Sequence, residues 1–159
     1  MTARSFSIIS VDEKKCVGCM MCEIVCSLTK EKEVNPDRSR IKVYGLHSYI
    51  DLPVVCRQCS DAPCEKACEY EAISRGKNNA IIINSDNCNG CGLCLDACPF
   101  GAIFLHPETD IAETCDLCEG KPVCVKYCPT GCLDYSLWEN SLEAKRGTEK
   151  TLYEKLILN

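Results

Sequence analysis

The sequence predicts a small α+β protein with little regular secondary structure, built from repeated cysteine-rich units that surround metal. The chain has 159 residues, of which 17 are cysteines, far above ordinary usage. The aromatic residues are few (Phe 3, Trp 1, Tyr 6), so a core of organic side chains would be thin. Most of the cysteines also follow one recurring spacing. Metal centres are therefore expected to fill and cross-link the interior.

Four sets of four cysteines organise the chain. The first and third sets have the spacing C-x2-C-x2-C-x3-C, the second C-x2-C-x4-C-x3-C and the fourth C-x2-C-x5-C-x3-C. Every set opens with C-x2-C and closes with C-x3-C, and only the middle loop varies. In chain order the sets are Cys16, Cys19, Cys22 and Cys26; Cys56, Cys59, Cys64 and Cys68; Cys88, Cys91, Cys94 and Cys98; and Cys115, Cys118, Cys124 and Cys128.

Short apolar stretches flank the sets. Phe6–Val11 and Ala80–Ile83 precede the first and third sets and are predicted to be strands, and Glu71–Ile73 and Gly101–Ile103 begin strands after the second and third sets. Gly76–Asn79 is a turn signal between two of these strands. Each unit is therefore expected to consist of a strand, a cysteine loop, a short helix and a second strand.

The repeats define one expected domain over residues 1–135. Residues 27–55 separate the first two sets and are interpreted as a surface insertion. This insertion contains a strand candidate at Arg40–Tyr44 and a charge run at Lys30–Glu33, which is expected to be a solvated face.

Residues 136–159 differ in character and are predicted to form a helical tail. Helix formers are frequent there, and apolar residues have the spacing of one helix face. The tail either packs on the body of the protein or docks on another subunit. The apolar positions are Leu152, Tyr153, Leu156 and Ile157.

Charge and hydropathy argue against several classes of protein. The net charge is −5, from 18 basic and 23 acidic residues, so the chain lacks the basic footprint of a nucleic-acid-binding protein. The sequence contains no run of about 18 apolar residues, the length that a membrane-spanning helix needs. Met1–Ser10 lacks the character of a signal peptide, so we expect a cytoplasmic location, where metal is favoured over disulfides.

The spacing of the sets is typical of [4Fe–4S] cluster ligation. A cubane cluster takes four thiolates, and a C-x2-C-x2-C loop supplies three of them. In bacterial C-x2-C-x2-C-x3-C-P runs, the fourth cysteine ligates the other cluster of a pair. Sixteen cysteines suffice for four clusters. Zinc is the competing metal, but its four-thiolate sites pair two C-x2-C units and require no third cysteine a few residues further on.

Residues outside the four sets offer little further chemistry. Cys132 is interpreted as a small buried hydrophobic residue rather than a reactive thiol. His47 and His106 are too few and too scattered to indicate a second kind of metal site. The chain has no Gly-rich phosphate loop and no cluster of acid–base residues, so we expect it not to be an enzyme on its own.

The motifs resemble those of the four-cluster, ferredoxin-type electron-transfer subunits found in dimethyl sulfoxide reductase and, as the beta-subunit, in formate dehydrogenase. The resemblance covers residues 5–135. The short length and the stretch Asn35–Ile41 (NPDRSRI) are more particularly similar to the small iron–sulfur subunits of tungsten aldehyde oxidoreductase, class II benzoyl-CoA reductase and carbon monoxide dehydrogenase. The motifs that carry the wider resemblance are Cys56-Arg57-Gln58-Cys59, Ala62-Pro63-Cys64, Cys88-Asn89-Gly90-Cys91 and Cys115-Asp116-Leu117-Cys118.

This resemblance implies a duplicated ferredoxin-like fold, made of two pseudo-repeated dicluster units, and a pairing of the first set with the fourth and the second with the third. One cluster would take three cysteines of one set and the last cysteine of its partner set. The implied ligands are Cys16, Cys19, Cys22 and Cys128; Cys115, Cys118, Cys124 and Cys26; Cys56, Cys59, Cys64 and Cys98; and Cys88, Cys91, Cys94 and Cys68.

The resemblance also implies a function. The chain would relay single electrons between a larger catalytic subunit with a tungsten or molybdenum pterin and a redox carrier or flavin-containing subunit, in anaerobic metabolism. A free-standing polyferredoxin and a redox-sensing cluster protein are the alternatives. The expected tail and the 29-residue insertion favour a docked subunit, and no DNA-binding or other output module is recognisable.

Overall fold

The structure of the protein is a computed structural model that describes residues 6–46, 50–76 and 78–141. Within these ranges the elements are short, and four sheets each have two antiparallel strands. The helices are α1 (Met21–Glu31), α2 (Pro63–Lys66), α3 (Leu93–Ala97) and α4 (Val123–Lys126). The strands are β1 (Ser7–Val11), β2 (Lys42–Leu46), β3 (Ile50–Val54), β4 (Ile73–Arg75), β5 (Ile81–Ile83), β6 (Ile103–Leu105), β7 (Ala112–Thr114) and β8 (Leu133–Leu137). This is the small mixed fold of few helices and small sheets that the sequence predicts.

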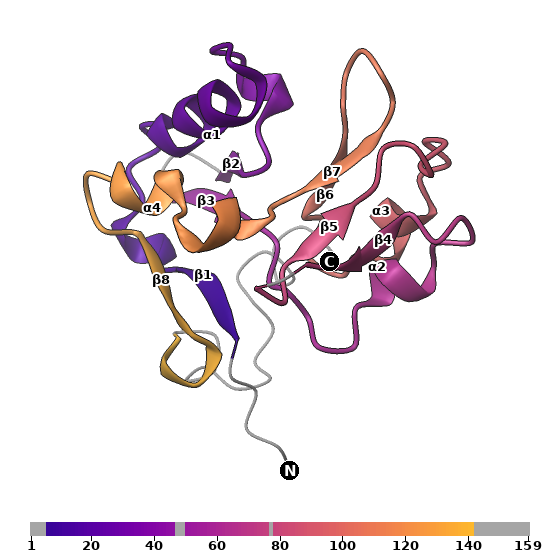
Figure 1. Cartoon of the computed structure of the whole chain (residues 1–159). Coiled ribbons are helices and arrows are strands. Elements are labelled where there is room, and N and C mark those ends of the chain that lie inside the picture. Colours follow the sequence, from indigo (N-terminus) through magenta and orange to yellow (C-terminus); the bar gives the residue numbers. More distant parts are fainter. Residues whose placement is uncertain (1–5, 47–49, 77, 142–159) are drawn as a thin grey trace.

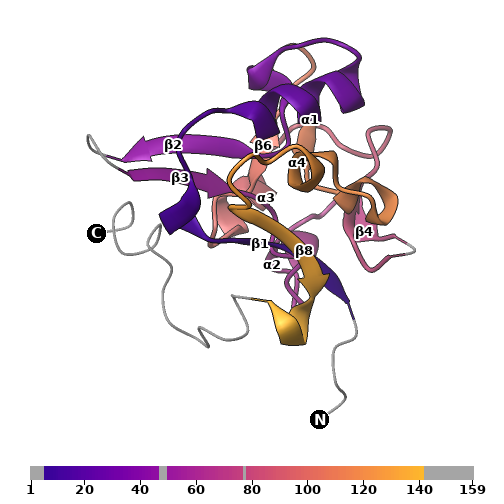
Figure 2. The same ribbon diagram turned by 90° about the vertical axis from the view of Figure 1, so that its left-hand side faces the viewer.

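Two lobes lie side by side (Figure 1). The central lobe, residues 56–114, holds α2, α3 and β4 to β7, and α2 packs on α3. The terminal lobe, the described residues of 6–55 and 115–141, holds the remaining elements, and α1 packs on α4. Strand β1 pairs with β8, with Val11 opposite Leu133 (Figure 2). The first and last described segments therefore build one lobe, and the first and fourth cysteine sets lie together in it.

A buried glutamine bridges the two lobes. The side chain of Gln58 is fully buried. Its amide nitrogen Nε2 donates a hydrogen bond to the carbonyl oxygen of Cys115 (2.7 Å), and its oxygen Oε1 accepts one from the backbone amide of Ile81 (2.6 Å). Because both partners are buried backbone groups that need a partner, Gln58 fixes the third set's leading strand against the start of the fourth set.

The predicted strands occur close to their expected places. Phe6–Val11 contains β1, and Ala80–Ile83 contains β5. Where the turn between β4 and β5 is expected, the Gly76 amide donates to the Ala80 carbonyl oxygen (2.8 Å) and the Asn79 amide to the Gly76 carbonyl oxygen (3.0 Å). Eight of the 26 buried hydrophobic residues in the described part of the chain are cysteines. Cysteines therefore make up a large part of the buried interior, as the composition predicts.

The interpretation of residues 27–55 as a surface insertion is corrected by the structure. The strand candidate at Arg40–Tyr44 is confirmed in part, because β2 begins at Lys42 and pairs with β3. Val43, Leu52 and Val54 of this hairpin, and Ile41 just before it, are buried in the main core. The charge run is not wholly solvated either, since Lys30 at the end of α1 binds Asp116 of the fourth set at 2.7 Å.

The structure describes the first residues of the predicted tail, as far as residue 141. Ser136 and Leu137, assigned to the tail from the sequence, are the last residues of β8, and Trp138–Asn140 form a 3-10 turn. The helix expected around Leu152–Ile157 lies outside the described residues. Across 6–46, 50–76 and 78–141, no helix combines the length and the apolar character that a membrane crossing requires.

Candidate metal centres

Sixteen cysteines come together in four places, and each place combines three cysteines of one set with the last cysteine of another. Three of the places are cavities, and the fourth is a group in which Cys98 lies close enough to Cys56, Cys59 and Cys64 to interact electrostatically. The family resemblance implies cluster ligation by these same four groups, and that ligand role stays a prediction. We name them site A (Cys16, Cys19, Cys22, Cys128), site B (Cys26, Cys115, Cys118, Cys124), site C (Cys56, Cys59, Cys64, Cys98) and site D (Cys68, Cys88, Cys91, Cys94).

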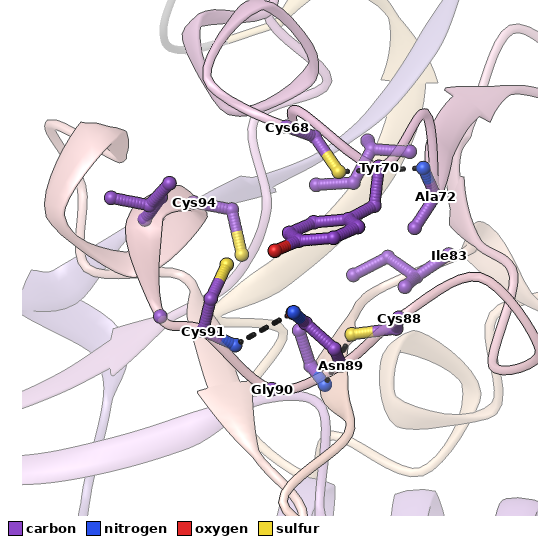
Figure 3. A pocket seen from close by; sticks show the side chains of 13 residues that line it. Cys68, Tyr70, Ala72, Ile83, Cys88, Asn89, Gly90, Cys91 and Cys94 are labelled. Carbon is purple, nitrogen blue, oxygen red and sulfur yellow. Dashed lines mark hydrogen bonds between the residues drawn. The ribbon is translucent and has the colours of Figure 1, made fainter.

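Site D illustrates how the local folding aims the thiols (Figure 3). Cys88 and Cys91 lie on the loop before α3, Cys94 on α3 and Cys68 just after α2, and all four line one cavity. The cavities of sites A and B are likewise each lined by the four cysteines of their group. The sulfur atoms surround a space, and no three Cys, His, Asp or Glu side chains in the described ranges lie close enough to hold a single metal ion.

One backbone conformation recurs at the start of all four sets. The residue two positions after the first cysteine has a positive φ in every case: 62° at Gly18, 51° at Gln58, 72° at Gly90 and 61° at Leu117. This left-handed conformation turns the chain sharply between the first two cysteines, so that both can face one cavity. It costs an ordinary L-residue about 1–2 kcal/mol. The structure around Gln58 and Leu117 must offset that cost, and both are fully buried.

Gly90→Ala is expected to destabilise the protein more than Gly92→Ala. Both glycines have positive φ, but a Cβ at Gly90 would lie 2.5 Å from the carbonyl oxygen of Asp110, whereas a Cβ at Gly92 would meet nothing within 4 Å. Gly92→Ala should therefore show only the left-handed penalty of about 1–2 kcal/mol, and Gly90→Ala a further 1–3 kcal/mol or so from overpacking. Anaerobic thermal unfolding at one scan rate measures the difference, and equal midpoints for the two variants would contradict it.

Backbone amides point at the sulfur atoms. Amides donate to Cys68 from Ala72 (3.3 Å), to Cys98 from Ala102 (3.4 Å) and to Cys88 from Ala112 (3.5 Å). Such hydrogen bonds tune the reduction potential of a bound cluster.

Burial opposes the ionisation of several of the thiols. It raises the pKa of Cys22, Cys56 and Cys124 to about 12 and that of Cys59 and Cys94 to about 11. In the metal-free chain these thiols are therefore neutral near pH 7, and each must release its proton when it binds iron. The groups of four thiols fit a [4Fe–4S] cluster, which takes one thiolate on each of four irons.

Asp116 holds the loop of the fourth set. Its carboxylate accepts a hydrogen bond from the Cys118 amide (3.0 Å) and forms ion pairs with Lys30 (2.7 Å) and Arg40 (3.4 Å). Burial opposes ionisation, but Lys30 and the Cys118 amide outweigh it and lower the pKa of Asp116. The sequence gives no direct signal for this role beyond the presence of Asp116 in the Cys115–Cys118 motif, because its cationic partners lie in distant segments.

The four sites follow one another in a line. Site A adjoins site B, because Cys22 and Cys124 lie close enough to interact electrostatically. In the same way, Cys115 of site B interacts with Cys56 of site C. Cys64 of site C interacts with Cys94 of site D. The end sites each have one exposed cysteine, Cys19 in site A and Cys91 in site D. The order is therefore A, B, C, D, and the two ends reach the surface in different lobes.

Short elements arranged around four groups of four cysteines define a cysteine-ligated metalloprotein. A family model described as a 4Fe-4S dicluster domain matches residues 47–137, and another, a 4Fe-4S binding domain, matches residues 13–32. Since the first covers more than half of the chain, the chain belongs to the 4Fe-4S dicluster domain family.

Curated relatives are electron-transport proteins and subunits. The polyferredoxin-like subunit of aliphatic sulfonate oxidoreductase from Pyrococcus furiosus is 41% identical over 88 residues, 55% of this chain and 51% of that protein. The putative electron transport protein YsaA of Escherichia coli is 39% identical over 94 residues, 55% of this chain and 59% of that protein. Formate hydrogenlyase subunit 2 of Escherichia coli is 34% identical over 86 residues, 54% of this chain and 41% of that protein. These matches therefore span about half the length of the relatives.

Among solved structures, the chain is similar to one in the active-site complex BamBC of benzoyl-coenzyme A reductase bound to benzoyl-CoA. The TM-score is 0.52 with 31% identity, over 84% of this chain and 81% of that one. The resemblance to ferredoxin-type iron–sulfur electron-transfer subunits, noted from the motifs, is confirmed. The number of four clusters stays a prediction. A particular link to tungsten or to aldehydes stays a prediction.

Proposed function

We propose that the protein relays single electrons through four [4Fe–4S] clusters bound at sites A, B, C and D, without transforming a substrate itself. The observation that carries the proposal is the linear order of the four sites with an exposed cysteine at each end, Cys19 and Cys91. Each bound cluster would accept and give up one electron. The duplicated ferredoxin-like architecture belongs to the same proposal, supported by the left-handed turn that recurs in all four sets.

The chain's own residues would position the clusters and insulate the middle of the line. In the inner sites B and C, Cys26, Cys115, Cys124, Cys56 and Cys64 are buried, so water is kept from most of their sulfur atoms. Exclusion of water and amide hydrogen bonds to sulfur are the means by which a protein sets the potential of a cluster. The inner sites would therefore exchange electrons only with their neighbours in the line.

The exposed ends indicate two partners. Around Cys19, the neighbouring side chains Val17, Met20 and Met21 are exposed, and around Cys91 the side chains Tyr70 and Leu93 are exposed. Apolar groups beside a solvent-reaching redox site suit contact with another redox protein. We propose a larger catalytic oxidoreductase subunit at one end and a carrier or flavin-containing subunit at the other.

A finer proposal concerns the kind of catalytic partner. The resemblance of Asn35–Ile41 to small subunits of tungsten enzymes supports a tungsten or molybdenum pterin subunit. The similarity to a chain of the benzoyl-coenzyme A reductase complex agrees with this. An aldehyde oxidoreductase in an anaerobic metabolism is one partner of this kind.

Reductive titration tests the relay directly. Anaerobically purified protein should accept about four electrons per chain from titanium(III) citrate, one per cluster, with bleaching of its visible absorption. The same preparation from the native host should contain a larger redox subunit. Four electrons without any partner would favour a free polyferredoxin, and a protein that accepts no electrons would refute the relay.

A further inference from the structure

We propose that Cys132 is a fifth thiol of site A that can replace Cys16 as a cluster ligand. The inference rests on the proposed function, since it concerns one of the four clusters. Cys132 lies outside the four sets, yet it is buried and lines the same cavity as Cys16, Cys19, Cys22 and Cys128. Its thiol lies close enough to that of Cys16 to interact with it.

The backbone holds Cys132 at this place through strand pairing. The register of β1 with β8 sets Val11 opposite Leu133, and just beyond it the amide of Asp12 donates to the carbonyl oxygen of Cys132 (2.8 Å). Asp12 is four residues before Cys16. The pairing of β1 with β8 therefore holds Cys132 beside the start of the loop that carries Cys16.

Site D has the same construction with alanine in place of this cysteine. Ala72 lies four residues after Cys68, as Cys132 lies four residues after Cys128, and it lines the cavity of site D. Ile83 pairs with Ile73 as Val11 pairs with Leu133, and the Asn84 amide donates to the Ala72 carbonyl at 2.8 Å. Ala72 and Cys132 are both buried. Sites A and D are thus matched, and only site A has a fifth thiol in its cavity.

A fifth thiol cannot bind while the four others are in place, because a cubane has one terminal thiolate on each of its four irons. Cys132 would then remain a protonated thiol beside Cys16. When the Cys16 sulfur is absent, the neighbouring iron lacks a ligand, and the Cys132 sulfur is the free thiol that already faces the same space. Site A should therefore tolerate a loss that site D does not.

Iron content of anaerobically purified variants tests the proposal. Cys16→Ala should keep the wild-type iron, whereas Cys88→Ala, the matching change in site D, should lose one to four irons per chain, depending on whether a three-iron cluster remains. Cys132→Ala alone should keep its iron, because it recreates the alanine of site D. Cys16→Ala/Cys132→Ala should lose as much iron as Cys88→Ala.

The reverse transfer provides a second measurement. Cys88→Ala/Ala72→Cys places a thiol in site D where Cys132 lies in site A, and it should regain the iron that Cys88→Ala loses. If the Cys16→Ala/Cys132→Ala protein does not fold, the iron content of Cys88→Ala/Ala72→Cys tests the proposal in its place. The proposal is overturned if Cys16→Ala loses as much iron as Cys88→Ala, or fails to fold where Cys88→Ala folds. Wild-type protein without iron would instead refute the proposed function.

Discussion

Removal of iron is expected to unfold most of the chain. The strands have three to five residues and α2, α3 and α4 only four or five, lengths at which isolated helices and two-stranded sheets are not stable in water. Packing offers little compensation, because half of the buried hydrophobic residues in the described part are cysteine or alanine. The metal centres must therefore supply the cross-links, as in small metalloproteins whose binding energy is folding energy.

The experiment compares far-UV circular dichroism and protease resistance before and after anaerobic chelation of iron. We expect the cooperative thermal transition to disappear with the iron and to return on reconstitution with iron and sulfide. A mock treatment without chelator is the control. Metal-free protein that keeps the original transition would contradict the expectation, and equal recovery with zinc alone would point to structural zinc sites.

The second large effect concerns cysteines that ligate across sets. Cys98 closes the third set in the sequence, but in the structure it lies with Cys59 in site C, whereas Cys91 of the same set lies in site D. Cys98→Ala should therefore remove the same cluster signal as Cys59→Ala. Since a cluster with three ligands loses iron or falls apart, at least one iron per chain should be lost in each variant.

Redox titration followed by electron paramagnetic resonance identifies which cluster is affected. Cys59→Ala marks the component of site C, and Cys91→Ala marks that of site D. The spectrum of Cys98→Ala should lack the component missing from Cys59→Ala and retain the one missing from Cys91→Ala. The reverse pattern would show that each set ligates its own cluster, and the groupings of sites A to D would be wrong.

The sequence predicts the local features well because local residues determine them. The C-x2-C loops, the strand at Ala80–Ile83 and the turn at Gly76–Asn79 depend on neighbours within a few positions. Which sets share a site was not derivable from spacing, because it depends on β1 pairing with β8 across more than a hundred residues. The family resemblance implied that pairing, and its use in cluster ligation stays a prediction.

The residues that sequence reasoning missed act over long range. Gln58 bonds to Cys115, 57 positions away, and Asp116 to Lys30, 86 positions away. Neither contact has a periodic or spacing signal. Residues 27–55 were misjudged for a related reason, because the alternation at Arg40–Tyr44 indicates a strand with one buried face but does not say what covers it. Cys132 was correctly expected to be buried, but its cavity is visible only in the fold.

Iron, sulfide and zinc analysis of anaerobically purified protein tests the four-cluster relay most directly. Four sites of four cysteines predict about sixteen irons and about sixteen inorganic sulfides per chain, with no stoichiometric zinc. Zinc in place of iron, or no more than about eight irons after full reconstitution with iron and sulfide, would contradict the continuous line of clusters from Cys19 to Cys91.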